Sequence, residues 1–127
     1  MAKKPRKKEL SEDEAMRIAI KSHPEWRSQW ERGTLPDEIT GEDGQPMSPQ
    51  LHLTVHAIVE RQLAADDPKG VVGIARQLEQ LGVSRHDVRH AIGQAVAGQL
   101  WALGHEGRTF DADRYLAELR AIVESYM

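Results

Sequence analysis

Leu51-His52-Leu53-Thr54-Val55-His56-Ala57-Ile58-Val59-Glu60 is the stretch around which the rest of the chain can be arranged. Its two histidines are four residues apart, which on a helix places both rings on one face, one turn above the other. At 100° per residue, Val55, Val59 and Leu63 lie within about 60° of His52, and Glu60 lies at about 80°. We therefore expect an inward-facing histidine pair inside an apolar stripe, with Glu60 on the edge of that stripe.

A second stretch, Arg85-His86-Asp87-Val88-Arg89-His90, repeats the histidine spacing. Short connections predict antiparallel neighbours, so the helix between the two stretches should bring their helices parallel. Ser48 and Ser84 are the predicted N-caps, and His52 and His86 follow them by four and two residues, an axial offset of about 3 Å. Four imidazoles would then converge near one end of the bundle, with Glu60 one turn further along.

Neutral imidazoles inside a protein are common metal ligands, and this pattern predicts a metal site. The predicted ligands are His52, His56, His86, His90 and Glu60. Such a set suits Zn or Fe, and also Ni or Cu, far better than Mg or Ca. Glu60 is either a fifth ligand or a candidate base. An open coordination position would allow a metal-bound water or chemistry with O2, which is a hypothesis about reaction class only.

Three other interpretations remain open for these residues. The histidines can be structural core residues, hydrogen-bonded to backbone or to Glu60. Two helix N-termini with Arg85, Arg89 or Arg61 can form a pocket for phosphate or another anion. His86-Asp87-Val88-Arg89-His90 also has the outline of a zincin motif, but aspartate replaces the catalytic glutamate and no strand pattern precedes it, so a protease is disfavoured.

Capping residues and hydrophobic periodicity predict an all-α, single-domain bundle of five to six helices without a convincing strand. Trp26 and Trp30 are four residues apart and predict a flap packed on the bundle, with a ligand-stacking platform as the alternative. Residues 33–47 form a long loop that wraps the bundle or acts as a lid. The predicted helices run from about Glu12 to His23, Glu25 to Arg32, Ser48 to Ala65, Asp67 to Gly82 and Ser84 to Leu103, with a last helix after Asp111.

The first residues differ in charge from the rest. The chain of 127 residues has a net charge of −3, yet five basic side chains fall within its first eight residues: Lys3, Lys4, Arg6, Lys7 and Lys8. We interpret residues 1–10 as a basic, flexible arm and residues 11–127 as the bundle. The arm predicts a contact with nucleic acid or the ribosome, so the rival function is a non-enzymatic interaction module that uses the arm and the tryptophan flap.

The composition excludes sites and cross-links that depend on cysteine. The chain has no cysteine, so thiolate metal sites, thiol nucleophiles and disulfides are ruled out. We expect a cytoplasmic protein, since no apolar segment follows the N-terminal charges as in a secretory signal, and no run approaches a membrane span.

Residues 48 to 120 resemble a bacterial family known as domain of unknown function 1841. The shared features are a Pro-x-Leu-His-x-x-x-His helix, a nearby glutamate and glutamine, and a later His-x-x-x-His helix ending in a tryptophan. They correspond here to Pro49, Leu51, His52, His56, Glu60, Gln62, Asp67-Pro68, His86, His90 and Trp101. Arg61 separates the glutamate from the glutamine, and Ala91-Ile92-Gly93 departs from the more polar family segment. The resemblance implies that the histidines matter but implies no activity.

Overall fold

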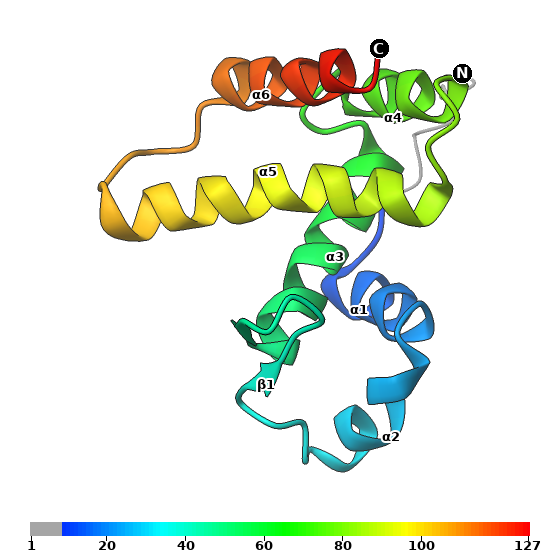
Figure 1. Ribbon diagram of the computed structural model, residues 1–127, viewed down its shortest axis with the longest axis vertical. Helices are drawn as coiled ribbons and strands as arrows, with labels where there is room; N and C mark the ends of the chain where they lie inside the picture. Colours follow the sequence, from blue (N-terminus) through cyan, green and yellow to red (C-terminus); the bar gives the residue numbers. More distant parts are fainter. Residues whose placement is uncertain (1–8) are drawn as a thin grey trace, which may run out of the picture.

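A computed structural model describes residues 9–127, which form six helices and one small hairpin (Figure 1). The elements are α1 (Glu12–Lys21), α2 (Pro24–Arg32), β1 (Ile39–Thr40), β2 (Pro46–Met47), α3 (Pro49–Ala65), α4 (Val71–Gln80), α5 (Arg85–His105) and α6 (Ala112–Ser125). The all-α prediction is confirmed. No helix within the described range combines the length and apolar character needed to cross a lipid bilayer.

Side-chain caps fix several helix starts where the sequence predicts them. Ser11 and Glu14 form a complete capping box at α1, and the hydroxyls of Ser48 and Ser84 accept from backbone N–H groups three residues later. Asp111 does the same at α6, and the rings of Phe110 and Tyr115 lie 5.6 Å apart, as expected for a hydrophobic staple.

Two of the boundaries that differ from the prediction do so for a local reason. The helix expected from Asp67 begins at Val71, because the Asp66 carboxylate accepts from the N–H groups of Gly70 and Val72. The helix expected to end at Leu103 continues to His105, and the left-handed residue that follows it is Gly107, with φ of 64°, rather than Gly104.

The segment 33–47 is not structureless. It contains an antiparallel hairpin in which Ile39 pairs with Met47 and Thr40 pairs with Pro46. The expectation of no strand is therefore corrected. Ile39 and Met47 pack against the helices below α5, so the segment wraps that end of the bundle (Figure 1).

Helix α3 is the spine of the molecule because it serves two separate hydrophobic cores. Val55 and Val59 enter the C-terminal core, whereas Leu53 and Ala57 enter the N-terminal core. The C-terminal core also contains Val71, Ile74, Ala75, Leu78, Val88, Ala91, Ile92, Ala95, Val96, Tyr115, Leu116, Leu119 and Val123. The N-terminal core also contains Ala15, Ala19, Ile20 and Trp26.

Helices α3 and α5 cross instead of running parallel as predicted (Figure 1). Left-handed backbone at Asp66 (φ 50°) and Gly70 (φ 109°) redirects the chain between α3 and α4. The crossing is close at Gly93, where an added Cβ would lie 3.2 Å from Val55 Cγ1. Glycine at this position of α5 therefore allows the two helices to approach closely.

Candidate metal centre

The histidines of α3 lie on the seam between the two cores. On this helix, Leu53 and Ala57 lie about 60° to 100° to one side of His56, and Val55 and Val59 lie at similar angles on the other side. His52, His56 and Glu60 therefore form a line between two apolar stripes that face different cores. This is why His56 is 5 % exposed and Glu60 9 % exposed although both are polar.

A third histidine, His23, comes from the corner between α1 and α2. Its Nδ1 lies 2.8 Å from the carbonyl oxygen of Ala19, and a carbonyl has no hydrogen to give, so Nδ1 carries the proton. The ring stacks on Trp26 at a centroid distance of 5.2 Å and an interplanar angle of 5°. These contacts hold the ring and leave Nε2 without a proton, so that it can accept a hydrogen bond from His52 Nε2, 3.1 Å away, or bind an ion.

The fourth histidine, His90, comes from α5 about one turn before the close crossing at Gly93. Its ring centroid lies 4.9 Å from that of His56 and 5.4 Å from that of His52. Within residues 9–127, its buried Nε2 has no hydrogen-bond partner. A buried polar atom without a partner costs about 1–3 kcal/mol, so this nitrogen indicates a ligand or another missing partner.

His23, His52, His56 and His90, here called the histidine cluster, bring four ring nitrogens within 4.8 Å of one another. Two imidazoles on one tetrahedral zinc ion have nitrogens about 3.3 Å apart, given Zn–N bonds of 2.0–2.1 Å. Moderate side-chain movements would therefore close the cluster around one ion. The cluster draws on α3, on α5 and on the corner between α1 and α2, so no local segment makes it alone.

The surroundings of His52, His56 and His90 lower the pKa of all three imidazoles. Burial, followed by repulsion from His23, lowers the pKa of His56 to about 3 and that of His52 to about 4. Burial, followed by repulsion from His86, also lowers the pKa of His90. Neutral imidazole is the form that binds metals, so the protein holds these side chains ready for an ion at neutral pH.

Two of the five predicted ligands lie outside the cluster. His86 is exposed, with its ring 4.3 Å from that of His90 but 6.5 Å from that of His23. The Glu60 carboxylate forms a largely buried ion pair with Arg89. The structure thus brings together His52, His56 and His90 from the predicted set.

The residues of the predicted anion site are placed differently. Arg89 is engaged by Glu60 and also contacts the backbone oxygen of Arg85, whose side chain is exposed. The basic side chains of the arm, Lys3, Lys4, Arg6, Lys7 and Lys8, lie outside the described residues.

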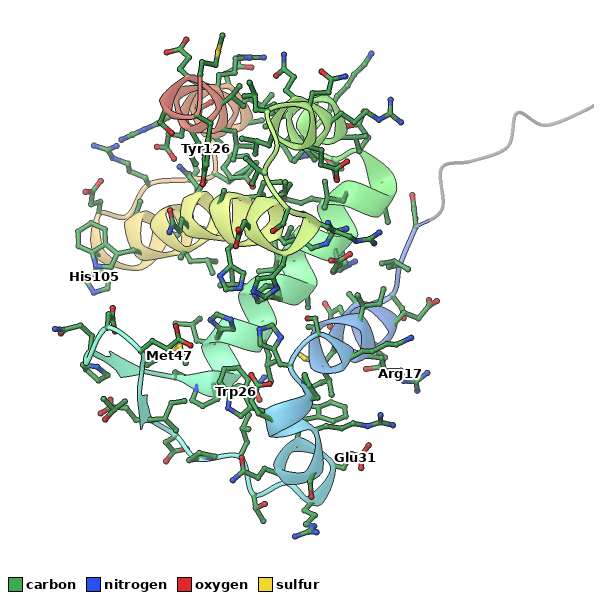
Figure 2. All side chains as sticks on the ribbon, turned by 45° about the vertical axis from the view of Figure 1, so that its right-hand side comes forward. Arg17, Trp26, Glu31, Met47, His105 and Tyr126 are labelled. Carbon is green, nitrogen blue, oxygen red and sulfur yellow. The ribbon has the colours of Figure 1, made fainter. Side chains whose placement is uncertain are left out.

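The residue that sequence reasoning missed is His23. It is a single histidine without a spaced partner, and Pro24 after it indicated only a helix boundary. Trp26 offered a signal, because a tryptophan three residues after a histidine, at the start of a helix, can stack on that ring. Trp26 is buried in the N-terminal core, which agrees with the predicted packing of the tryptophan flap (Figure 2).

Two cavities flank the cluster, and Pro46 and Met47 of β2 line both (Figure 2). The larger, about 860 Å³, contacts His23, His52 and His90 and carries the acidic residues Glu25, Glu42 and Asp43. The smaller, about 430 Å³, contacts His52, His56 and His90 and has mostly apolar walls.

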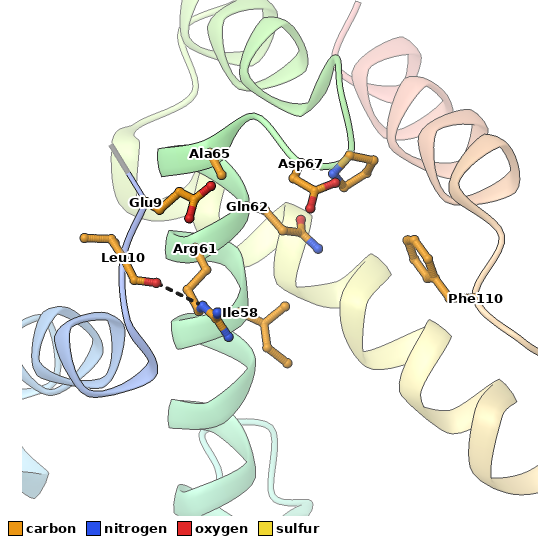
Figure 3. A pocket seen from close by; sticks show the side chains of 9 residues that line it. Glu9, Leu10, Ile58, Arg61, Gln62, Ala65, Asp67 and Phe110 are labelled. Carbon is orange, nitrogen blue, oxygen red and sulfur yellow. Dashed lines mark hydrogen bonds between the residues drawn. The ribbon is translucent and has the colours of Figure 1, made fainter. Parts of the chain in front are cut away.

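A third cavity, of about 440 Å³, lies at the other end of α3 and has no histidine among its lining residues (Figure 3). There the Arg61 Nε donates to the Leu10 carbonyl oxygen at 3.2 Å. This contact ties the segment before α1 to α3, so we read this cavity as part of the packing between those segments.

Comparison with known families gives one match. The family described as a domain of unknown function (DUF1841) matches residues 1–121, which is wider than the likeness seen in residues 48 to 120 and includes His23. No curated protein and no solved structure matches this chain.

Proposed function

We propose that this chain, which belongs to the DUF1841 family, is a metal-binding protein whose histidine cluster holds one transition-metal ion. The observation that carries the proposal is the convergence of four imidazoles from α3, α5 and the corner between α1 and α2, with ring nitrogens within 4.8 Å of one another. Two of these side chains, His23 and His56, are buried. Burial of titratable side chains this close together is unusual unless they bind a common partner.

The chemistry of the donors selects the class of ion. Four neutral imidazoles suit Zn, Fe, Ni or Cu, whereas Mg and Ca prefer oxygen ligands. The Ala19 carbonyl fixes the tautomer of His23 in the way that outer hydrogen bonds commonly orient metal-binding histidines. We favour Zn or Fe as the resident ion.

The main competing explanation is a set of structural histidines joined by hydrogen bonds. It accounts for the 3.1 Å contact between His23 Nε2 and His52 Nε2, where one ring can donate to the other. It gives no partner to the buried Nε2 of His90 within the part of the chain that the structure describes. A bound ion would account both for the short contact between His23 and His52 and for the buried nitrogen of His90.

The decisive experiment is elemental analysis of the full-length, tag-free protein purified without chelators. We expect near-stoichiometric transition metal in the natural chain and none in a variant with all four cluster histidines changed to glutamine. A matched control changes His86 and the distant His105 to glutamine and should keep the metal. Absence of metal in the natural protein, even after titration with Zn, Fe, Ni and Cu, would overturn the proposal.

A second candidate function is supported by the five basic side chains within residues 1–8. They favour a contact with a polyanion such as nucleic acid or the ribosome, and such contacts weaken steeply with salt. Deletion of residues 1–8 should abolish salt-sensitive RNA binding without changing the metal content. RNA binding that survives the deletion would contradict this function.

A further inference from the structure

The smaller cavity beside the histidine cluster has the size and walls of a small-molecule site. Its volume of about 430 Å³ falls within the range of about 300–1,000 Å³ common for ligand pockets. Three of the four cluster histidines, His52, His56 and His90, line it, so a molecule inside the cavity would lie against the side chains that hold the proposed ion. Apolar and small residues form much of the remainder, namely Pro46, Met47, Leu51, Val55, Gly93 and Ala97.

The charge of this cavity is balanced. Arg89 is the one formally charged side chain among the described residues that line it, and its Nε is bound by the Glu60 carboxylate. The larger cavity differs, because Glu25, Glu42 and Asp43 line it without any described lysine or arginine. The two cavities are therefore suited to different molecules. The larger, acidic cavity favours cations, and the smaller, charge-balanced and apolar cavity favours an uncharged ligand.

We propose that the smaller cavity binds an uncharged small molecule with an apolar body and a single nitrogen or oxygen donor, placed so that the donor faces the histidine cluster. This inference rests on the proposed metal site, because the donor is expected to bind the ion. Iron, nickel, copper and cobalt accept five or six ligands, so four imidazoles leave a position open to such a donor.

The walls are suited to hold the apolar part of this ligand. Leu51 is 55 % exposed on the first turn of α3, where no described side chain covers it fully. Met47, from β2, has a flexible and polarisable side chain that adapts to different shapes. Gly93 also lines the cavity, at the point where its lack of a side chain lets α5 pass close to Val55 of α3.

The test uses two probes that share one donor. Imidazole and 4-phenylimidazole are titrated into the full-length protein loaded with Co²⁺, and the visible absorption of the cobalt reports binding at the ion. We expect 4-phenylimidazole to bind at least about tenfold more tightly, because its phenyl ring leaves water for the apolar walls.

Two variants locate the phenyl ring. Ala97→Phe fills the cavity from an exposed position of α5, and Leu51→Glu adds a carboxylate to the wall at a helix position that favours acids. Each should remove the preference for 4-phenylimidazole but keep cobalt and imidazole binding. The control Ala121→Phe, on an exposed face of α6, should keep the preference.

The outcomes separate the two proposals. Cobalt binding with equal affinity for both probes, or a preference that Ala97→Phe and Leu51→Glu leave unchanged, overturns the ligand site and leaves the metal site standing. Failure of the natural chain to bind cobalt or any of the other transition metals overturns both.

Discussion

The histidine pairs of α3 and α5 have the same spacing, yet they end in different surroundings. Both His52 and His56 belong to the histidine cluster, whereas on α5 only His90 does and His86 is exposed. The difference arises because α5 crosses α3, so only the part of α5 near the close approach at Gly93 reaches the cluster. A four-residue spacing aligns two rings on their own helix, but the packing of a second helix decides how many of them converge.

The largest expected effect comes from removing His56, one of the two buried members of the cluster. His56→Ala should weaken metal binding by about 100-fold or more, because it removes a ligand rather than a supporting contact. Affinity is measured by competition with a calibrated chelator. The control Val59→Ala, also on α3 and fully buried, should lower the free energy of unfolding while metal affinity stays near its natural value. Equal metal losses in both variants would show that His56 acts only through packing.

Glu60, the next member of the line on α3, is expected to act indirectly. Glu60→Gln removes the partner of Arg89 and leaves a largely buried positive charge one residue before His90. We expect metal affinity to fall by about tenfold, in the range found for residues that support metal ligands. Adding Arg89→Met should restore part of the loss, since it removes the unpaired charge. A double variant weaker than Glu60→Gln alone would contradict this explanation.

The pH dependence of stability should distinguish His52 and His56 of α3 from histidines with an ordinary pKa. The pKa of His56 is about 3 and that of His52 about 4 in the folded, metal-free chain, against about 6.5 in the unfolded chain. Above pH 6.5 both states keep the rings neutral, and stability does not depend on them. As the pH falls from 6.5 towards 4, only the unfolded state takes up the protons, so the folded state loses stability.

The size of this effect follows from the shift. Between pH 7 and pH 5, His56 alone should lower the free energy of unfolding by about 1–2 kcal/mol, and the less buried His52 by a smaller amount. Urea denaturation of the metal-free protein measures this loss. A variant with both residues changed to glutamine should show a shallower pH dependence, and an unchanged slope would mean that the two rings have the same pKa in the folded and unfolded states.

The smallest expected effect is at the exposed histidine of α5. His86→Ala should change metal affinity by less than about threefold, because its side chain is exposed and lies outside the cluster, although its ring is near that of His90. His90→Ala on the same helix, one turn later, should reduce affinity far more. Similar losses from both substitutions would place His86 among the ligands and restore the symmetry that the sequence suggested.

The sequence predicted those features that depend on neighbouring residues. Serine and aspartate caps, together with apolar periodicity, gave the helices, and the inward faces of His52, His56 and His90 followed from the same periodicity. Features that depend on long-range packing were not predictable. The crossing of α3 and α5 depends on left-handed turns at Asp66 and Gly70, and the entry of His23 depends on how α1 and α2 dock on α3.

Because the chain has no cysteine, no disulfide can link its two cores, and an ion bound in the histidine cluster would take that role. An ion held by His23 and His90 would be a reversible cross-link that closes a loop of about half the chain. It would also join the N-terminal core to the C-terminal core, which otherwise share little more than α3. Binding or loss of the ion would then change the stability of the whole bundle, as reduction changes the stability of a disulfide-bonded protein. The supply of metal would therefore determine how long the protein stays folded.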